Sequence, residues 1–264
     1  MTYRYVDDVE PESLPANIKL YNAANLDRGL DVAESALKDR PVNVCVVNHF
    51  KDAAFAEYLE GLVHKNKLPS LTLNSCEHID MFEEELSAYF DIFARKVPLS
   101  MRNENHDAVF RRTLLQTAKA LFRKTQDHKI TLEIRVDKPD KNYYIHIDGG
   151  NVSSVKDCRD KVFFRQNAKV IMNLVNTGTA LFDNQDVLSN IARVDQADND
   201  EIKTYKYYRI NALSAQATAW YAKPLSLVVF PCETWSHEPL CHSKAIKEHS
   251  KDTRRANAIF YIEP

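Results

Sequence analysis

The segment ITLEIRV at residues 130–136 alternates strictly between apolar and polar side chains. Its apolar residues occupy every second position, so they lie on one face of an extended strand. Before this segment the apolar residues recur at helical spacing, and after it they recur with the period of strands. The change near residue 129 predicts a mostly helical part, 1–129, and a β-rich part, 130–264.

Six further segments in the second part have the composition of strands. They are NYYIHID (142–148), AKVIMNLV (168–175), TYKYYRI (204–210), ATAWYA (217–222), LSLVVF (225–230) and NAIFYI (257–262). Turn and loop residues separate them. A succession of strands without helices between them is typical of a sandwich or barrel and not of a parallel sheet with crossover helices.

The first part alternates helices with at least one strand. Helices are predicted at 27–40, 51–66, 79–96 and 106–126, and a buried strand at 41–50. Asp80 and Glu83 occupy the positions of a capping box at the start of the third helix. No repeat or low-complexity linker divides the chain, so we expect a single domain, 1–264, of the α+β class, in which the helices pack around a β-rich core.

Composition narrows the range of functions. The 264 residues are 44% hydrophobic and carry a net charge of −2, which is typical of a globular protein and argues against nucleic acid as a partner. The five cysteines form no CxxC pair, which indicates reduced thiols and a cytoplasmic protein. No apolar run approaches the ~20 residues that a membrane helix needs. No glycine-rich phosphate-binding motif is present.

The strand-like segment at 142–148 carries the first candidate site. His146 and Asp148 are two residues apart, so on a strand they point to the same face, as does Tyr144. Gly149 and Gly150 follow and allow the backbone to turn sharply. A histidine and a carboxylate in this arrangement are two of the three ligands of a facial triad, which binds Fe(II) and leaves three coordination positions open. An ordinary strand that runs into a turn is the alternative interpretation.

The C-terminal region offers the remaining members of such a site. His242 follows the predicted strand 225–230 and can serve as the distal metal ligand, with His237 as a competitor. Arg254 and Arg255 open the last predicted strand, and either guanidinium could form a bidentate pair with a carboxylate. The nearby Cys241 is better interpreted as a packed thiol.

These residues, in this order, resemble the Fe(II)/2-oxoglutarate-dependent oxygenases. That superfamily has a double-stranded β-helix (jelly-roll or cupin-like) core with an HxD motif, a distant histidine, and then an arginine or lysine. The segment KVIMNLVNTGTALF (169–182) is similar to the strand–turn–strand of prolyl-hydroxylase-like members. The order HxD, NTGT, CHS and RR is also similar to an uncharacterised bacterial family of unknown function. The resemblance covers roughly residues 130–264.

The resemblance implies a function and a set of roles. His146, Asp148 and His242 would bind Fe(II), and Arg255, or Arg254, would bind the far carboxylate of 2-oxoglutarate. Further cofactor-binding candidates are Tyr144, Asn173 and Thr179. The implied activity is that of a dioxygenase, and because Asp148 is present, hydroxylation is favoured over halogenation. The partners would be molecular oxygen and a small-molecule or peptide substrate.

Two other functions fit the same residues. A cupin-like metal-binding protein could use the same ligands without 2-oxoglutarate. A catalytically inactive β-helix could bind a ligand or a partner. In the cupin-like protein Arg255 would be dispensable. The inactive β-helix would show no iron-dependent turnover, including uncoupled decay of 2-oxoglutarate.

Overall fold

The computed structural model describes residues 2–39, 41–125, 128–137, 168–176, 178–186, 192–194, 207–209, 214, 216–231, 242–243 and 254–263. The α-helices in these ranges are α1 Leu26–Ala36, α2 Ala53–His64, α3 Ile79–Lys96 and α4 Glu104–Thr125. The strands are β1 Thr2–Tyr5, β2 Ile18–Asn22, β3 Val44–Asn48, β4 Leu71–Thr72, β5 Lys129–Asp137, β6 Ala168–Val175, β7 Ala180–Leu181, β8 Ala192–Val194, β9 Tyr207–Arg209, β10 Thr218–Tyr221, β11 Leu227–Pro231, β12 His242–Ser243 and β13 Arg255–Glu263.

The four predicted helices form, and three of them begin at side-chain caps, that of α4 being Asn103. The Asn25 side chain accepts a hydrogen bond from the Arg28 amide at 2.9 Å at the start of α1, and Asp52 accepts one from the Phe55 amide at 2.9 Å at the start of α2. Such caps satisfy backbone donors that have no partner within the helix.

The capping box predicted for α3 is wrong. The helix begins after His78, which makes no side-chain capping bond. Glu83, the expected partner in the box, instead forms an ion pair with Lys119 of α4 at 2.7 Å. The carboxylate therefore links α3 to α4, and α3 begins without a side-chain cap.

Two sheets form the centre of the molecule. The large sheet has the strand order β2-β3-β11-β6-β13-β5-β4, and the small sheet has the order β1-β10-β7-β12. A separate ribbon pairs β8 with β9. From β5 onward the pairs within the two sheets are antiparallel, and only β1–β10 and β2–β3 are parallel.

The chain winds back and forth between these sheets. After β6 in the large sheet come β7 and β10 in the small sheet, then β11 in the large, β12 in the small and β13 in the large. Alternation of this kind is the winding of a jelly roll, so the core is the double-stranded β-helix expected from the sequence. The predicted strand at 142–148 lies outside the described residues.

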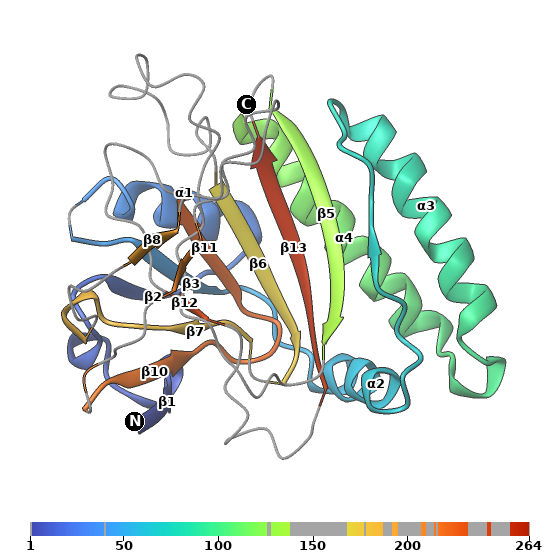
Figure 1. The fold of residues 1–264 in the computed structure, drawn as a ribbon. Helices are drawn as coiled ribbons and strands as arrows, with labels where there is room; N and C mark the ends of the chain where they lie inside the picture. The colour runs from blue at the N-terminus through green and yellow to red at the C-terminus, as the bar shows by residue number, and fades with distance from the viewer. Residues whose placement is uncertain are drawn as a thin grey trace.

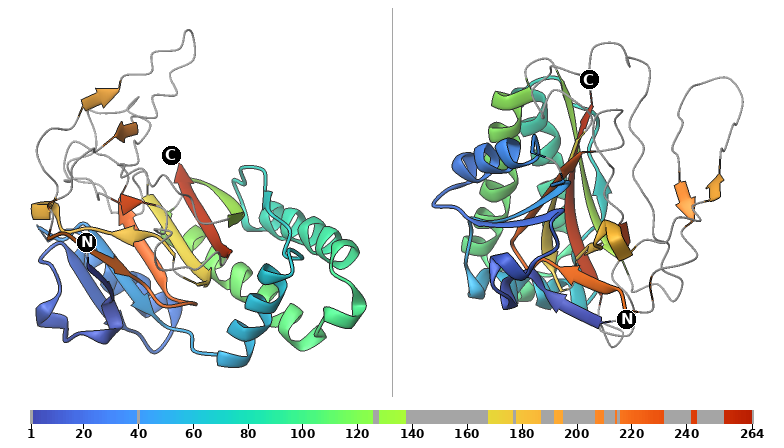
Figure 2. Two further views of the ribbon diagram at one scale, coloured as in Figure 1. Left: turned by 60° about the horizontal axis from the view of Figure 1, so that its bottom comes forward. Right: turned by 90° about the vertical axis from the view of Figure 1, so that its left-hand side faces the viewer.

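Two apolar cores lie between the layers of helices and sheets. One core lies between the helices and the large sheet, and the second lies between the two sheets. The second core brings Ile171 and Ile259 of the large sheet against Leu181 and Trp220 of the small sheet. Figure 2, in its right-hand view, shows the helices on one side of the large sheet and β1, β7 and β10 on the other.

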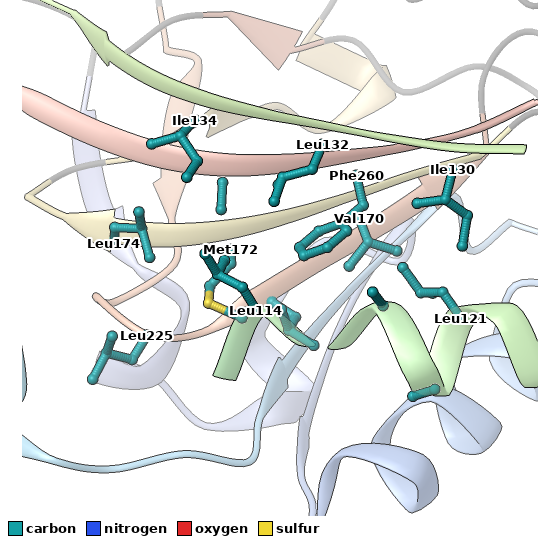
Figure 3. Packing of buried hydrophobic residues seen from close by; sticks show 14 of the residues in the cluster. Leu114, Leu121, Ile130, Leu132, Ile134, Val170, Met172, Leu174, Leu225 and Phe260 are labelled. Atoms are coloured by element: carbon teal, nitrogen blue, oxygen red, sulfur yellow. The ribbon is translucent and has the colours of Figure 1, made fainter. Parts of the chain in front are cut away.

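Strand alternation decides which side chains enter which core. The residues of β5 predicted to share a face, from Ile130 to Ile134, point toward α4 together with Val170 and Met172 of β6 and Phe260 of β13 (Figure 3). These side chains are at most 1% exposed. The intervening residues of the same strands therefore point to the opposite face of the sheet.

The first 129 residues contribute more strands than the one that the sequence predicted. Strands β2, β3 and β4 lie in the large sheet, and β1 pairs with β10 in the small sheet (Figure 1). The helical part of the chain is thus built into both sheets. None of the helices in the described ranges is long and apolar enough to cross a membrane.

Two helical glycines provide a matched test of the packing between α1 and β3. A methyl group added at Gly29 would lie 2.5 Å from Cγ1 of Val47, whereas one added at Gly61 meets no atom within 4 Å. We expect Gly61→Ala to stabilise the protein by roughly 0.5–1 kcal/mol through helix propensity. Gly29→Ala should destabilise it by about 1–3 kcal/mol through overpacking. Urea unfolding of both variants measures the difference, and equal effects would contradict this packing.

Candidate functional site

The inner face of the large sheet, which faces the small sheet, carries a row of polar side chains on β5 and β13. Glu133, Arg135 and Asp137 are the residues of β5 that alternate with its apolar positions. On β13, Arg255 lies opposite Asp137 and Asn257 lies opposite Arg135. Because these pairs are neighbours across two strands, their side chains can interact directly.

Arg255 is the most deeply buried charge in this row. The residue is 4% exposed, and its Nη2 donates to Oδ2 of Asp137 at 3.2 Å. Burial lowers the pKa of the Arg255 guanidinium, whereas attraction to Asp137 opposes that shift. Arg255 shares a face of β13 with Ile259, which lies in the core between the sheets, so the guanidinium is on the side of the small sheet. A guanidinium here remains charged and can pair with a carboxylate.

Arg254 lies in a different environment. Its backbone carbonyl accepts a hydrogen bond from the Asn176 side chain at 2.6 Å, and its guanidinium donates to the side chain of Asn66, just after α2. The two adjacent arginines therefore have separate partners, as expected where neighbouring residues of an extended chain point in opposite directions. Arg255 thus meets a carboxylate, that of Asp137, whereas Arg254 meets an amide oxygen.

The predicted metal ligands are described only in part. His242 begins β12, where its backbone pairs with Leu181 of β7 in the small sheet. The side chain of His242 lies outside the description, as do His146, Asp148 and Tyr144 entirely. His237, the competing histidine, lies outside it as well. Among the described residues, no group of three or more His, Cys, Asp or Glu side chains could hold a metal ion.

Asn173 has a structural environment. Its side-chain nitrogen donates to the carbonyl oxygens of Asn176 at 2.8 Å and Ala222 at 3.0 Å, which ties β6 to the two turns that follow β6 and β10. The remaining Oδ1 atom is buried and has no hydrogen-bond partner in the part of the chain that the structure describes. An amide that has committed both hydrogens cannot donate to a carboxylate, and its oxygen would repel one. The structure therefore favours a structural role over the predicted cofactor contact.

Thr179 and the turn before it lie next to Asn173. Thr179 is 7% exposed and immediately precedes β7. At Gly178 an added methyl group would lie 2.8 Å from Cγ of Asn173, so only glycine allows the turn to approach this closely. The NTGT segment thus has a packing reason for its glycine, and Thr179 is buried beside it.

Two residues of the candidate site were not identified from the sequence. Asp137 follows the strand predicted at 130–136, and its carboxylate accepts a hydrogen bond from Arg255. Asn257 is 4% exposed and lies two residues from Arg255 on the same strand face. Only its side-chain nitrogen could donate to a carboxylate held by Arg255, because the amide oxygen is an acceptor. The alternating polar residues of β5 and β13 are the sequence feature that could have identified Asp137 and Asn257.

A second group of charges lies further along the same face. Arg135 donates two hydrogen bonds to Glu133, at 2.8 and 2.6 Å, and the Tyr261 hydroxyl donates to Glu133 at 2.7 Å. Lys169 lies 4.8 Å from the centre of the Tyr261 ring. Burial raises the pKa of Glu133, but these hydrogen bonds and the charges of Arg135 and Lys169 outweigh it, and the net pKa is lowered. The inner face is therefore a charged surface whose groups are mutually paired.

Comparison with known proteins gives matches only among solved structures. No family model matches the chain, and no curated protein sequence matches it. HygX from Streptomyces hygroscopicus, with nickel and 2-oxoglutarate bound, is 10% identical, with 92% of this chain and 88% of that chain covered and a TM-score of 0.43. A Pseudomonas putida prolyl-4-hydroxylase is 12% identical, with 89% and 91% covered and a TM-score of 0.34.

The iron and alpha-ketoglutarate-dependent endoperoxidase NvfI is 12% identical, with 99% of this chain and 93% of that chain covered and a TM-score of 0.41. The likeness of this chain to these solved structures is weak. At these identities and TM-scores it establishes neither a reaction nor a substrate. The double-stranded β-helix is assigned from the order of the strands.

The role of Asn173 can be tested by removing its side chain. Asn173→Ala leaves one buried and one partly buried carbonyl oxygen without their donor, and we expect a loss of about 2–4 kcal/mol in the free energy of unfolding. Asn74→Ala is the control, because its side-chain bond to Glu85 is exposed, and the loss there should stay below about 0.5 kcal/mol. Urea unfolding measures both. Wild-type stability for Asn173→Ala would contradict the structural role.

Proposed function

We propose that the protein is a non-haem Fe(II), 2-oxoglutarate-dependent oxygenase, and a hydroxylase in particular, that acts on a small-molecule or peptide substrate. The observation that carries the proposal is the buried guanidinium of Arg255 at the start of β13, in a jelly roll whose preceding strand β12 begins with His242. A buried cation that faces the space between two sheets is costly unless it pairs with an anion.

The donor set of the three predicted ligands suits iron. Two imidazoles, from His146 and His242, and the carboxylate of Asp148 are the composition of a facial triad. Iron bound there together with 2-oxoglutarate would supply the oxidising power of the reaction from molecular oxygen. The roles proposed for the chain are to hold the metal with these residues and to keep water from the site within the inter-sheet core.

The proposed role of Arg255 is to bind and orient the far carboxylate of 2-oxoglutarate. Its planar group presents five donors in a fixed fork, which matches a carboxylate in two-point geometry. Because Arg255 is almost fully buried, the pairing takes place away from bulk water, where charge-assisted hydrogen bonds are stronger. Asn257 lies on the same face and would contact the same carboxylate.

The metal site is tested by an anaerobic titration of the protein with Fe(II) and 2-oxoglutarate. We expect a weak visible charge-transfer band in the wild type and its loss in both His146→Ala and His242→Ala, because each variant removes one ligand. His237→Ala is the matched control and should keep the band. If His237→Ala loses the band and His242→Ala keeps it, the distal ligand is His237 and not His242.

The two arginines are distinguished by their affinity for 2-oxoglutarate. Removing one partner of a buried charge pair costs about 2–5 kcal/mol, so Arg255→Gln should raise Kd by roughly 30-fold or more. Arg254→Gln should leave Kd within about threefold of wild type, because Arg254 contacts Asn66 instead. Calorimetric titration measures both, and thermal unfolding verifies that each variant folds. The reverse order of effects would show that Arg254 is the anchor.

One observation favours a second function. The guanidinium of Arg255 already has a counter-ion in Asp137. In a cupin-like metal-binding protein this ion pair would be purely structural, and 2-oxoglutarate would not be a ligand. Metal binding without 2-oxoglutarate binding in the titrations above would support that alternative.

A further inference from the structure

Asp137 shares the guanidinium to which a ligand carboxylate would bind. It is the last residue of β5 and the direct cross-strand neighbour of Arg255. We propose that Asp137 is a built-in competitor that weakens the binding of the dicarboxylate co-substrate at Arg255 and so sets its affinity. This inference rests on the proposed function and adds a specificity-determining residue to it.

The geometry of the ion pair between Arg255 and Asp137 would allow a second anion to join Asp137 or to replace it. One nitrogen of Arg255 meets one oxygen of Asp137, at 3.2 Å, and within the described part of the chain the side chain of Arg255 makes no other hydrogen bond. A two-point pair would bring both carboxylate oxygens to the guanidinium at about 2.7–2.9 Å. Among the described residues, the single long contact therefore leaves most of the guanidinium donors for a second carboxylate.

The exposed fractions of the Arg255 and Asp137 side chains agree with this geometry. The side chain of Arg255 is 5% exposed, whereas that of Asp137 is 24% exposed. Asp137 therefore reaches water from the end of its strand while Arg255 stays enclosed. An entering carboxylate would approach the guanidinium next to an existing negative charge, and like charges at such short range repel strongly where water is scarce.

The neighbouring Arg135 has its main partner in Glu133, and Asp137 adds a smaller attraction. Arg135 is held by two hydrogen bonds from its guanidinium to Glu133, with Tyr261 bonded to the same carboxylate. Removing the charge of Asp137 therefore leaves Arg135 paired. The change acts mainly on Arg255, whose attraction for an incoming anion increases when the competing charge is gone.

The test is the affinity for 2-oxoglutarate of protein loaded with Mn(II) in place of Fe(II), measured by calorimetry. We expect Asp137→Asn to lower Kd by roughly tenfold, with Mn(II) affinity unchanged, since it keeps the shape of the side chain and removes the charge. Asp137→Glu, which retains the charge, should stay near the wild-type Kd. Glu77→Gln is the matched control, because Glu77 pairs with Lys129 at the other end of β5.

Each outcome is informative. Unchanged or weaker binding by Asp137→Asn overturns the inference, since Asp137 would then be inert or would position Arg255. No binding of 2-oxoglutarate by the wild type overturns the proposed function and this inference with it. Should Asp137→Asn unfold at lower temperature than wild type, Asp137→Ser provides the same removal of charge, and the same decrease in Kd is expected.

Discussion

The large sheet must cover both of its faces, and this constraint determines where chemistry is possible in the molecule. Helices cover one face, and the small sheet covers the other. The central strands β3 and β11 are accordingly buried along their whole length. Polar side chains enter the inner face mainly on β5 and β13, beyond the centre of the inter-sheet core. Each of them needs a partner there, because an unpaired polar group away from water is costly.

The strands and helices with a strong period could be predicted, and the short elements could not. The alternation of residues 130–136 identified β5, and the apolar runs at 168–175 and 257–262 identified β6 and β13. Strands β4, β7 and β12 have two residues each, so they contain no full period to detect. Strand β1 pairs with β10, more than 200 residues away. Such pairing depends on tertiary contacts that local sequence does not contain.

In the candidate site, too, some features follow from the local sequence pattern and others depend on the three-dimensional structure. Arg254 and Arg255 are equivalent in the sequence, but adjacent residues of the chain face different surroundings, and only Arg255 turns toward the small sheet. Asn173 is the opposite case. Its strand and face were predictable, but the use of its amide by two backbone carbonyls follows from turns whose geometry the sequence does not reveal.

The charges of the inner face illustrate how a covered sheet can keep ionised groups. Glu133, Arg135 and Tyr261 satisfy one another, and their hydrogen bonds hold the pKa of Glu133 below its usual range despite burial. Arg255 lacks such a network among the described residues, because a single contact to Asp137 balances its charge. A fully paired group is a stable part of a core, whereas a buried cation with one weak contact retains capacity for another anion. Two parts of the same strand pair thus differ: the Glu133 group in the middle is closed by its own hydrogen bonds, and the end at Arg255 is where a ligand carboxylate would gain most.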